Sequence, residues 1–113
     1  MHEMALTESI VEIVCEEARK GGFGKVRVVR LRIGAMAHVE PEALRFCFDA
    51  VSRGTVAEGA ALDILRQAGE GWCFDCAKTI DMEERFSACP DCGGRHVQMT
   101  SGDELRVEEL EVD

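Results

Sequence analysis

The chain has 113 residues, the length of one modest domain with room for a small satellite. Its 13 Lys and Arg stand against 22 Asp and Glu, and the resulting net charge of −9 argues against nucleic acid as a partner, because neutralising phosphates needs a basic face. No basic, apolar leader is visible and no apolar run approaches about 18 residues, so we expect a cytoplasmic protein without a membrane segment.

A first helix is expected over residues 3–20, ended by Gly21-Gly22 where a left-handed residue is needed. Its apolar side chains recur at the i, i+4, i+7, i+8 spacing of one buried stripe. These residues are Leu6, Ile10, Ile13 and Val14. Cys15 lies beside the stripe and is interpreted as a small core residue.

Residues 25–34 alternate as a strand, with a change of parity that predicts a bulge near Val28 and Val29. Basic side chains then line the opposite, solvated face. They are Lys25, Arg27, Arg30 and Arg32.

A second helix starts at Pro41, whose missing N–H is harmless in a first turn, and ends at Gly54. Two apolar stripes predict that it is buried broadly, with Cys47 in the core. The stripes are Leu44, Cys47, Phe48 and Val51, and Ala43, Phe46 and Ala50.

Two more strands are expected over residues 60–67 and 103–112. The last carries glutamates that are complementary in sign to the arginines of the first strand. If these two strands are neighbours, cross-strand ion pairs would help to fix their register. These acids are Glu104, Glu108, Glu109 and Glu111. The predicted fold is α+β: a three-stranded mixed sheet covered by two helices, with an inserted zinc ribbon.

The expected domains are an α/β domain, residues 1–68 and 101–113, and a zinc-ribbon domain, residues 69–100. Gly69-Glu-Gly71 and Ser101-Gly102 are the predicted hinges between them.

Two Cys-x-x-Cys turns stand twelve residues apart and predict a tetrathiolate zinc site. Its ligands are Cys73, Cys76, Cys89 and Cys92. Four thiolates leave no open position for substrate, so this zinc is structural. The alternative is a redox site, which would need only one cysteine pair. Trp72 directly before Cys73 resembles the tryptophan that precedes the first cysteine of thioredoxin-type sites.

The sequence opens with Met1-His2-Glu3, ahead of the expected first helix. An α-amine, the amide nitrogen of residue 2 and the imidazole Nδ1 of His2 can chelate one planar cation, and Glu3 or a partner can supply a fourth donor. Nitrogen-rich planar coordination suits Ni(II) or Cu(II), and this geometry alone does not choose between them. The alternative is a solvated chain end without a metal.

Four features together resemble the HypA/HybF family of hydrogenase and urease nickel incorporation proteins. They are the opening Met1-His2-Glu3-Met-Ala-Leu-Thr-Glu-Ser-Ile10, Gly34 followed by Val39-Glu-Pro-Glu-Ala-Leu44, the two cysteine pairs, and Gly102-Asp-Glu-Leu105. The resemblance spans essentially the whole chain.

The resemblance implies a nickel metallochaperone for [NiFe]-hydrogenase maturation. Nickel would be the transferred cargo, carried by His2 with Glu3 beside it, and the four cysteines would hold structural Zn(II). Glu40 falls where relatives place an acid near the nickel end. The implied partners are the nickel-handling maturation GTPase and the hydrogenase large subunit precursor, and homo-oligomers are left open.

Some relatives carry a histidine directly after each cysteine pair, where this chain has Ala77 and Gly93. His96 is expected to be an exposed ribbon residue and His38 a loop residue, and neither is expected to be a metal ligand. The sequence is also compatible with two other functions. One is a protein–protein interaction module without its own nickel site, and the other is a thiol–disulfide enzyme using Cys73 and Cys76, which needs a free thiolate of low pKa.

Overall fold

The computed structural model describes residues 2–113, with side chains from Glu3 onward. The expected nickel ligands of Met1 and the His2 side chain therefore lie outside the described part. The chain forms two compact units. The first unit contains the residues up to Leu31, Val39–Leu65 and Arg106–Asp113, and the second contains Arg32–His38 and Arg66–Leu105. In the described residues no helix is long and apolar enough to cross a membrane.

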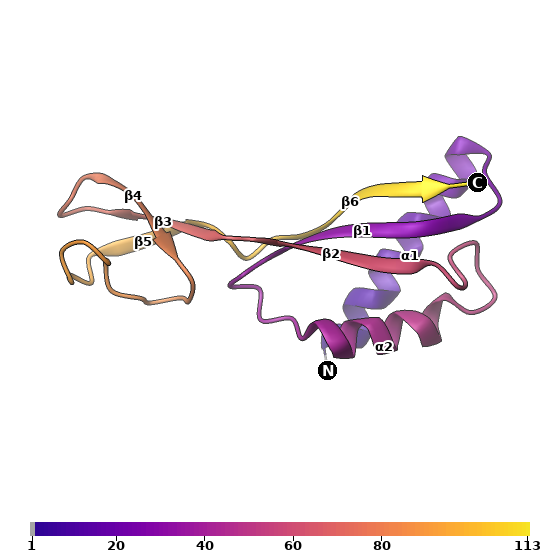
Figure 1. Cartoon of the computed structure of the whole chain (residues 1–113), viewed down its shortest axis with the longest axis horizontal. Coiled ribbons are helices and arrows are strands. Elements are labelled where there is room, and N and C mark those ends of the chain that lie inside the picture. Colours follow the sequence, from indigo (N-terminus) through magenta and orange to yellow (C-terminus); the bar gives the residue numbers. More distant parts are fainter. Residues whose placement is uncertain (1) are drawn as a thin grey trace. The chain divides into compact units, whose positions relative to one another are not determined.

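The α+β class predicted from the sequence is confirmed, with two helices and two three-stranded sheets (Figure 1). The larger sheet has the strand order β2-β1-β6, and both helices belong to the first unit. The elements are α1 (His2–Gly21), β1 (Val26–Gly34), α2 (Pro41–Ser52), β2 (Ala61–Gln67) and β6 (Leu105–Val112). Helix α1 begins one residue earlier than expected, so His2 and Glu3 lie in its first turn and not before it.

The buried face of α1 differs from the predicted stripe. Thr7, Ile10 and Val14 are fully buried, but Ile13 is 46% exposed, so its expected place in the core is wrong. The Thr7 hydroxyl donates to the Glu3 carbonyl at 2.7 Å, which allows a polar residue on the core face. The core-facing stripe is consequently rotated toward Thr7. Cys15 is half-buried beside it.

Helix α2 has one buried stripe and not two. Leu44, Cys47 and Phe48 are buried as predicted, whereas Phe46 is 76% exposed, so the expectation of broad burial is wrong. The helix begins at Pro41, and the Glu40 side chain accepts the backbone N–H of Glu42 at 3.1 Å as an N-cap.

The first and last strands of the larger sheet are neighbours, and ion pairs join them as expected for that arrangement. The Arg30 guanidinium on β1 binds the carboxylates of Glu111 at 2.8 Å and Glu109 on β6. It also binds Asp63 of β2 at 2.7 Å, so one side chain crosslinks all three strands. The buried positions of β1 change parity after Val26, as a bulge requires.

The second unit contains a smaller antiparallel sheet of order β4-β3-β5. Its strands are β3 (Gly69–Cys73), β4 (Lys78–Met82) and β5 (Val97–Ser101). Met36, Ile80 and Met82 pack with Cys73 and Cys89 as its core. Gly69–Gly71, the predicted hinge, instead forms the start of β3: all three residues pair with β4, and Glu70 and Gly71 also pair with β5.

Candidate metal centres

The four cysteines of the predicted zinc site come together in the second unit. Their Sγ atoms all lie within 4.8 Å of one another. Sγ atoms from different pairs are 3.8 Å apart for Cys73 and Cys92 and 3.9 Å apart for Cys76 and Cys89. Tetrahedral thiolates at about 2.3 Å from zinc would be separated by about 3.8 Å. The cysteine cluster therefore fits a structural Zn(II), with two ligands from each turn.

The two turns share one backbone design. The N–H of Ala77 donates to the Cys73 carbonyl, and the N–H of Gly93 donates to the Cys89 carbonyl, both at 2.8 Å. The residue after each pair has a left-handed φ, 54° at Ala77 and 73° at Gly93. This repeat presents the two cysteine pairs to a common centre from opposite turns.

Backbone N–H groups surround the sulfur atoms. Cys73, Cys89 and Cys92 each accept one such N–H at 3.4 Å. The donors are Cys76, Asp91 and Gly94 respectively. Hydrogen bonds of this kind favour the thiolate over the thiol. The turns therefore stabilise the negative charge that zinc binding needs.

Thiols of the cluster differ in pKa, and without a metal they do not all deprotonate together. The backbone N–H of Cys92 lowers the pKa of Cys89 to about 7, helped by the N–H of Asp91 and opposed by burial. Hydrogen bonds with the Cys92 and Cys73 sulfurs raise the pKa of Cys76 to about 12. Four adjacent thiolates repel one another, so a cation is needed to hold the cluster fully deprotonated.

An ion pair joins the two turns beside the sulfurs. The Lys78 ammonium, just after the first turn, contacts the carboxylate of Asp91, inside the second. The hydrogen bond with Asp91 raises the pKa of Lys78, and the sulfurs of Cys76 and Cys89 add to this effect. The sequence analysis did not predict this ion pair. Its signal in the sequence was a lysine shortly after the first Cys-x-x-Cys turn and an aspartate inside the second.

The other histidines stay outside the cysteine cluster, as expected. His38 is exposed on a loop with a φ of 55°. The ring of His96 stacks on Phe74 at 4.7 Å between centroids, and its Nδ1 lies 3.8 Å from a carboxylate oxygen of Asp75. Neither belongs to the group of metal-ligating side chains found in the described residues.

Glu3 is expected to lie beside the nickel site, and its side chain is described by the structure. Its carboxylate accepts a hydrogen bond within the first unit. The residue is 8% exposed, and its Oε2 accepts the backbone N–H of Glu40 at 3.3 Å. Glu40 in turn caps α2 through the N–H of Glu42. The two acids expected near the nickel end therefore form a link between the first turn of α1 and the start of α2.

Comparison with known proteins identifies the family of this two-part architecture. Residues 1–112 match the family described as "Hydrogenase/urease nickel incorporation, metallochaperone, hypA". The chain belongs to the HypA family. The resemblance noted in the sequence is thereby confirmed along nearly the full length.

Relatives within the HypA family cover the whole chain. The hydrogenase maturation factor HypA of Methylocella silvestris is 63% identical over 113 residues, which is 100% of both chains. That of Rhizobium leguminosarum bv. viciae is 60% identical and covers 99% of each. The solution structure of the Ni metallochaperone HypA from Helicobacter pylori has a TM-score of 0.70 at 25% identity, covering 97% of this chain and 96% of that one. A further solution structure of a HypA protein has a TM-score of 0.71 at 28% identity, covering 99% and 96%.

Proposed function

We propose that this protein is a nickel metallochaperone that binds Ni(II) at its amino terminus and delivers it during [NiFe]-hydrogenase maturation. The observation that carries the proposal is the HypA family match over residues 1–112, which includes both the opening tripeptide and the four cysteines. Residues 1–68 and 101–113 would serve nickel binding, and residues 69–100 would form the zinc ribbon.

The nickel ligands proposed are the α-amine of Met1, where it is the chain terminus, with the amide nitrogen and imidazole of His2. Helix α1 begins at His2, and the N–H groups of a first helical turn have no acceptor within the helix. The His2 amide can therefore release its proton to nickel without breaking a helical hydrogen bond. Such planar nitrogen coordination suits Ni(II).

Glu3 is proposed to complete the nickel site through its backbone nitrogen. Its carboxylate accepts the N–H of Glu40, so we assign that group to positioning: it fixes the first turn of α1 against the start of α2. A site built from one chain end is accessible from several directions. Nickel held there can pass to a recipient by ligand exchange, as an enclosed ion could not.

Zinc has a separate, structural role in this proposal. Cys73, Cys76, Cys89 and Cys92 would hold it, and it would supply the crosslink that keeps the two turns together. Four protein ligands leave no position for nickel or substrate. A thiolate bound to zinc is also withheld from thiol–disulfide exchange, so we propose no enzymatic activity.

The recipients are proposed from the role of the family in hydrogenase maturation. We propose the nickel-handling maturation GTPase and the [NiFe]-hydrogenase large subunit precursor as partners, and the cytoplasm as the location of transfer. Transfer to the precursor would be measured as nickel content of the recipient after mixing with loaded protein.

The deciding experiment is a nickel titration of the untagged protein and of its His2→Ala variant, monitored by the absorption of planar Ni(II). We expect His2→Ala to abolish the nickel site while one zinc per chain and the fold remain. His38→Ala and His96→Ala are matched controls that should bind nickel normally. A Gly-Ser extension before Met1 should also impair binding, because it displaces the α-amine.

Unchanged nickel stoichiometry in His2→Ala, or nickel seated among the sulfurs, would contradict the proposal. The same measurements test the two alternatives. A pure interaction module would take up no nickel at the amino terminus even when unmodified, and both the substitution and the extension would leave its partner binding unchanged. A thiol–disulfide enzyme would have thiols that alkylate before zinc is chelated, whereas we expect alkylation only afterwards.

A further inference from the structure

An apolar groove runs along the edge of the larger sheet in the first unit. It lies between α1 and β6, and acidic side chains stand at its rim. The apolar lining is Ile13, Phe23, Val107, Leu110 and Val112, and the acids are Glu17, Glu108 and Glu109. Ile13 is 46% exposed and Val112 is 39% exposed, so the core of the first unit leaves both partly uncovered.

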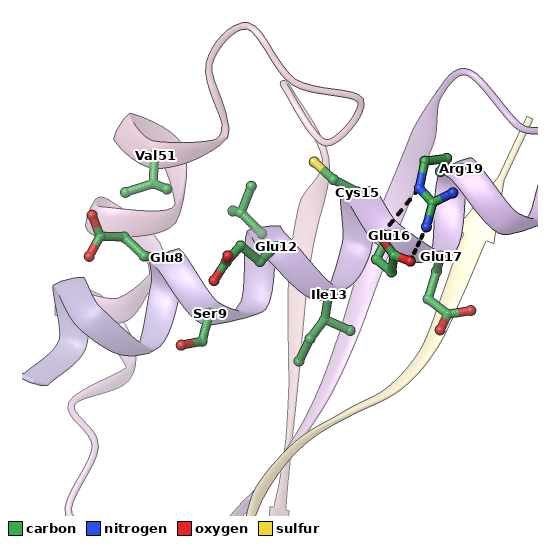
Figure 2. Close-up of a pocket in the computed structure, with 10 residues that line it drawn as sticks. Glu8, Ser9, Glu12, Ile13, Cys15, Glu16, Glu17, Arg19 and Val51 are labelled. Atoms are coloured by element: carbon green, nitrogen blue, oxygen red, sulfur yellow. Dashed lines mark hydrogen bonds and ion pairs between the residues drawn. The ribbon is translucent and has the colours of Figure 1, made fainter.

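Ile13 is the central feature of this groove. The core-facing stripe of α1 passes through Ile10 and Val14 and leaves Ile13 outside it. Figure 2 shows Ile13 and Glu17 on the opposite side of α1 from Cys15 and Val51. Together with Val112, Ile13 makes an exposed group of apolar side chains that an apolar partner could cover.

Strand β6 offers a second means of attachment. It is terminal in the order β2-β1-β6, so one of its edges has no neighbouring strand in the described part of the chain. Such an edge can accept another extended segment through backbone hydrogen bonds. A strand added there would point alternate side chains into the groove and out of it.

The charges along this edge select the occupant. Glu109 and Glu111 share the guanidinium of Arg30, and Glu108 pairs with Arg106. With Glu17, which also lines the groove, four carboxylates are present for these two guanidinium groups. A second copy of this chain would bring the same acidic edge and a net charge of −9, which makes self-pairing repulsive. A basic segment would be attracted.

We propose that the groove between α1 and β6 binds an extended, basic segment of a partner protein, in which apolar side chains alternate with Lys or Arg. The apolar side chains contact Ile13 and Phe23 in the groove. The basic ones face Glu109 and Glu111 across the new strand pair, and the backbone pairs with the edge of β6. This surface is separate from the cysteine cluster and goes beyond the nickel function proposed above.

The test uses the full-length, zinc-loaded protein labelled with ¹⁵N and ten-residue synthetic peptides. An alternating Lys–Val peptide is compared with Glu–Val, which reverses the charge, and Lys–Ser, which keeps the charge without the apolar groups. We expect the Lys–Val peptide to shift the amide signals of residues 105–112 and to slow the exchange of alternate amides there. The affinities of the Glu–Val and Lys–Ser peptides should be lower by at least about tenfold.

Matched variants locate the site. Ile13→Ser should weaken binding of the Lys–Val peptide by about tenfold. Phe46→Ser, which removes an even more exposed apolar side chain from α2, should leave the affinity unchanged. An N-methylated Lys–Val peptide, which cannot donate to the β6 edge, should also lose binding. The proposal is overturned if Lys–Ser binds as well as Lys–Val, if the shifts map outside α1 and β6, or if the Lys–Val peptide does not bind. Repeating the titration with His2→Ala separates this result from nickel binding, since the peptide should bind that variant normally.

Discussion

The Glu3 carboxylate accepts the backbone N–H of Glu40 at 3.3 Å, across 37 residues of sequence. Glu40 uses its own carboxylate to cap the next helix at Glu42. The residue adjacent to the proposed nickel ligand His2 is therefore tied to the start of α2. The proposed metal capture near His2 and the packing of the two helices would share this connection.

Replacing Glu3 should affect both properties. We expect Glu3→Ala to lower the free energy of unfolding by about 1–2 kcal/mol, because it removes a buried acceptor and leaves the Glu40 N–H without this bond. Glu3→Gln keeps an acceptor and should lose less. Urea unfolding measures stability, and a nickel titration should show weaker binding in proportion. Glu8→Ala, an exposed acid on the same helix, is the control. A Glu3→Ala variant as stable as the parent would refute the positioning role.

Much of this fold follows from local pattern. The strand alternation, the helix ends at glycine and proline and the cysteine spacing depend on chain geometry, so they predicted both helices, the strands of the larger sheet and the clustering of the four cysteines, but not the strands β3, β4 and β5. The opposed charges of β1 and β6 predicted ion pairs for the case that these strands are neighbours, and the Arg30 contacts are such pairs.

The errors arose where tertiary contacts decide. A hydrophobicity pattern places Ile13 inside and Thr7 outside, but the hydrogen bond from Thr7 to the Glu3 carbonyl makes the polar residue acceptable in the core. Phe46 is apolar yet exposed, and no periodicity separates a core side chain from one on an uncovered surface. Gly69 and Gly71 were expected to bend the chain, whereas the structure uses them for close approach of strands.

A substitution at Gly69 tests that last difference. A Cβ there would lie 2.4 Å from the Met82 carbonyl oxygen and 2.4 Å from the Met36 Cε. The Met82 backbone is fixed in β4, so Gly69→Ala should destabilise the protein by about 1–3 kcal/mol. Gly24→Ala, where nothing lies within 4 Å of the added Cβ, is the matched control and should be nearly neutral. A hinge role for Gly69 would instead predict little change in the urea midpoint.

Arg30 should be the most salt-sensitive residue of the larger sheet. Its guanidinium contacts Asp63, Glu109 and Glu111 and is 22% exposed. We expect Arg30→Met to lower the urea midpoint at about 0.02 M salt, where screening is weak, and to have a smaller effect at about 1 M. Arg27→Met is the control, because Arg27 is 62% exposed and pairs with Asp113 at 3.6 Å. Equal losses at both salt concentrations would show that Arg30 acts by packing instead.

Ala77 is expected to limit the stability of the first cysteine turn. Its φ of 54° is a left-handed conformation that alanine adopts at a cost of about 1 kcal/mol, and the equivalent residue of the second turn is Gly93 with a φ of 73°. We therefore expect Ala77→Gly to raise the free energy of unfolding by about 0.5–1 kcal/mol in urea and to leave zinc stoichiometry at one. Ala43→Gly in α2 is the control and should lower stability by about 1 kcal/mol, because glycine is unfavourable within a helix. A loss of stability in Ala77→Gly would mean that the methyl group makes contacts worth more than the strained backbone.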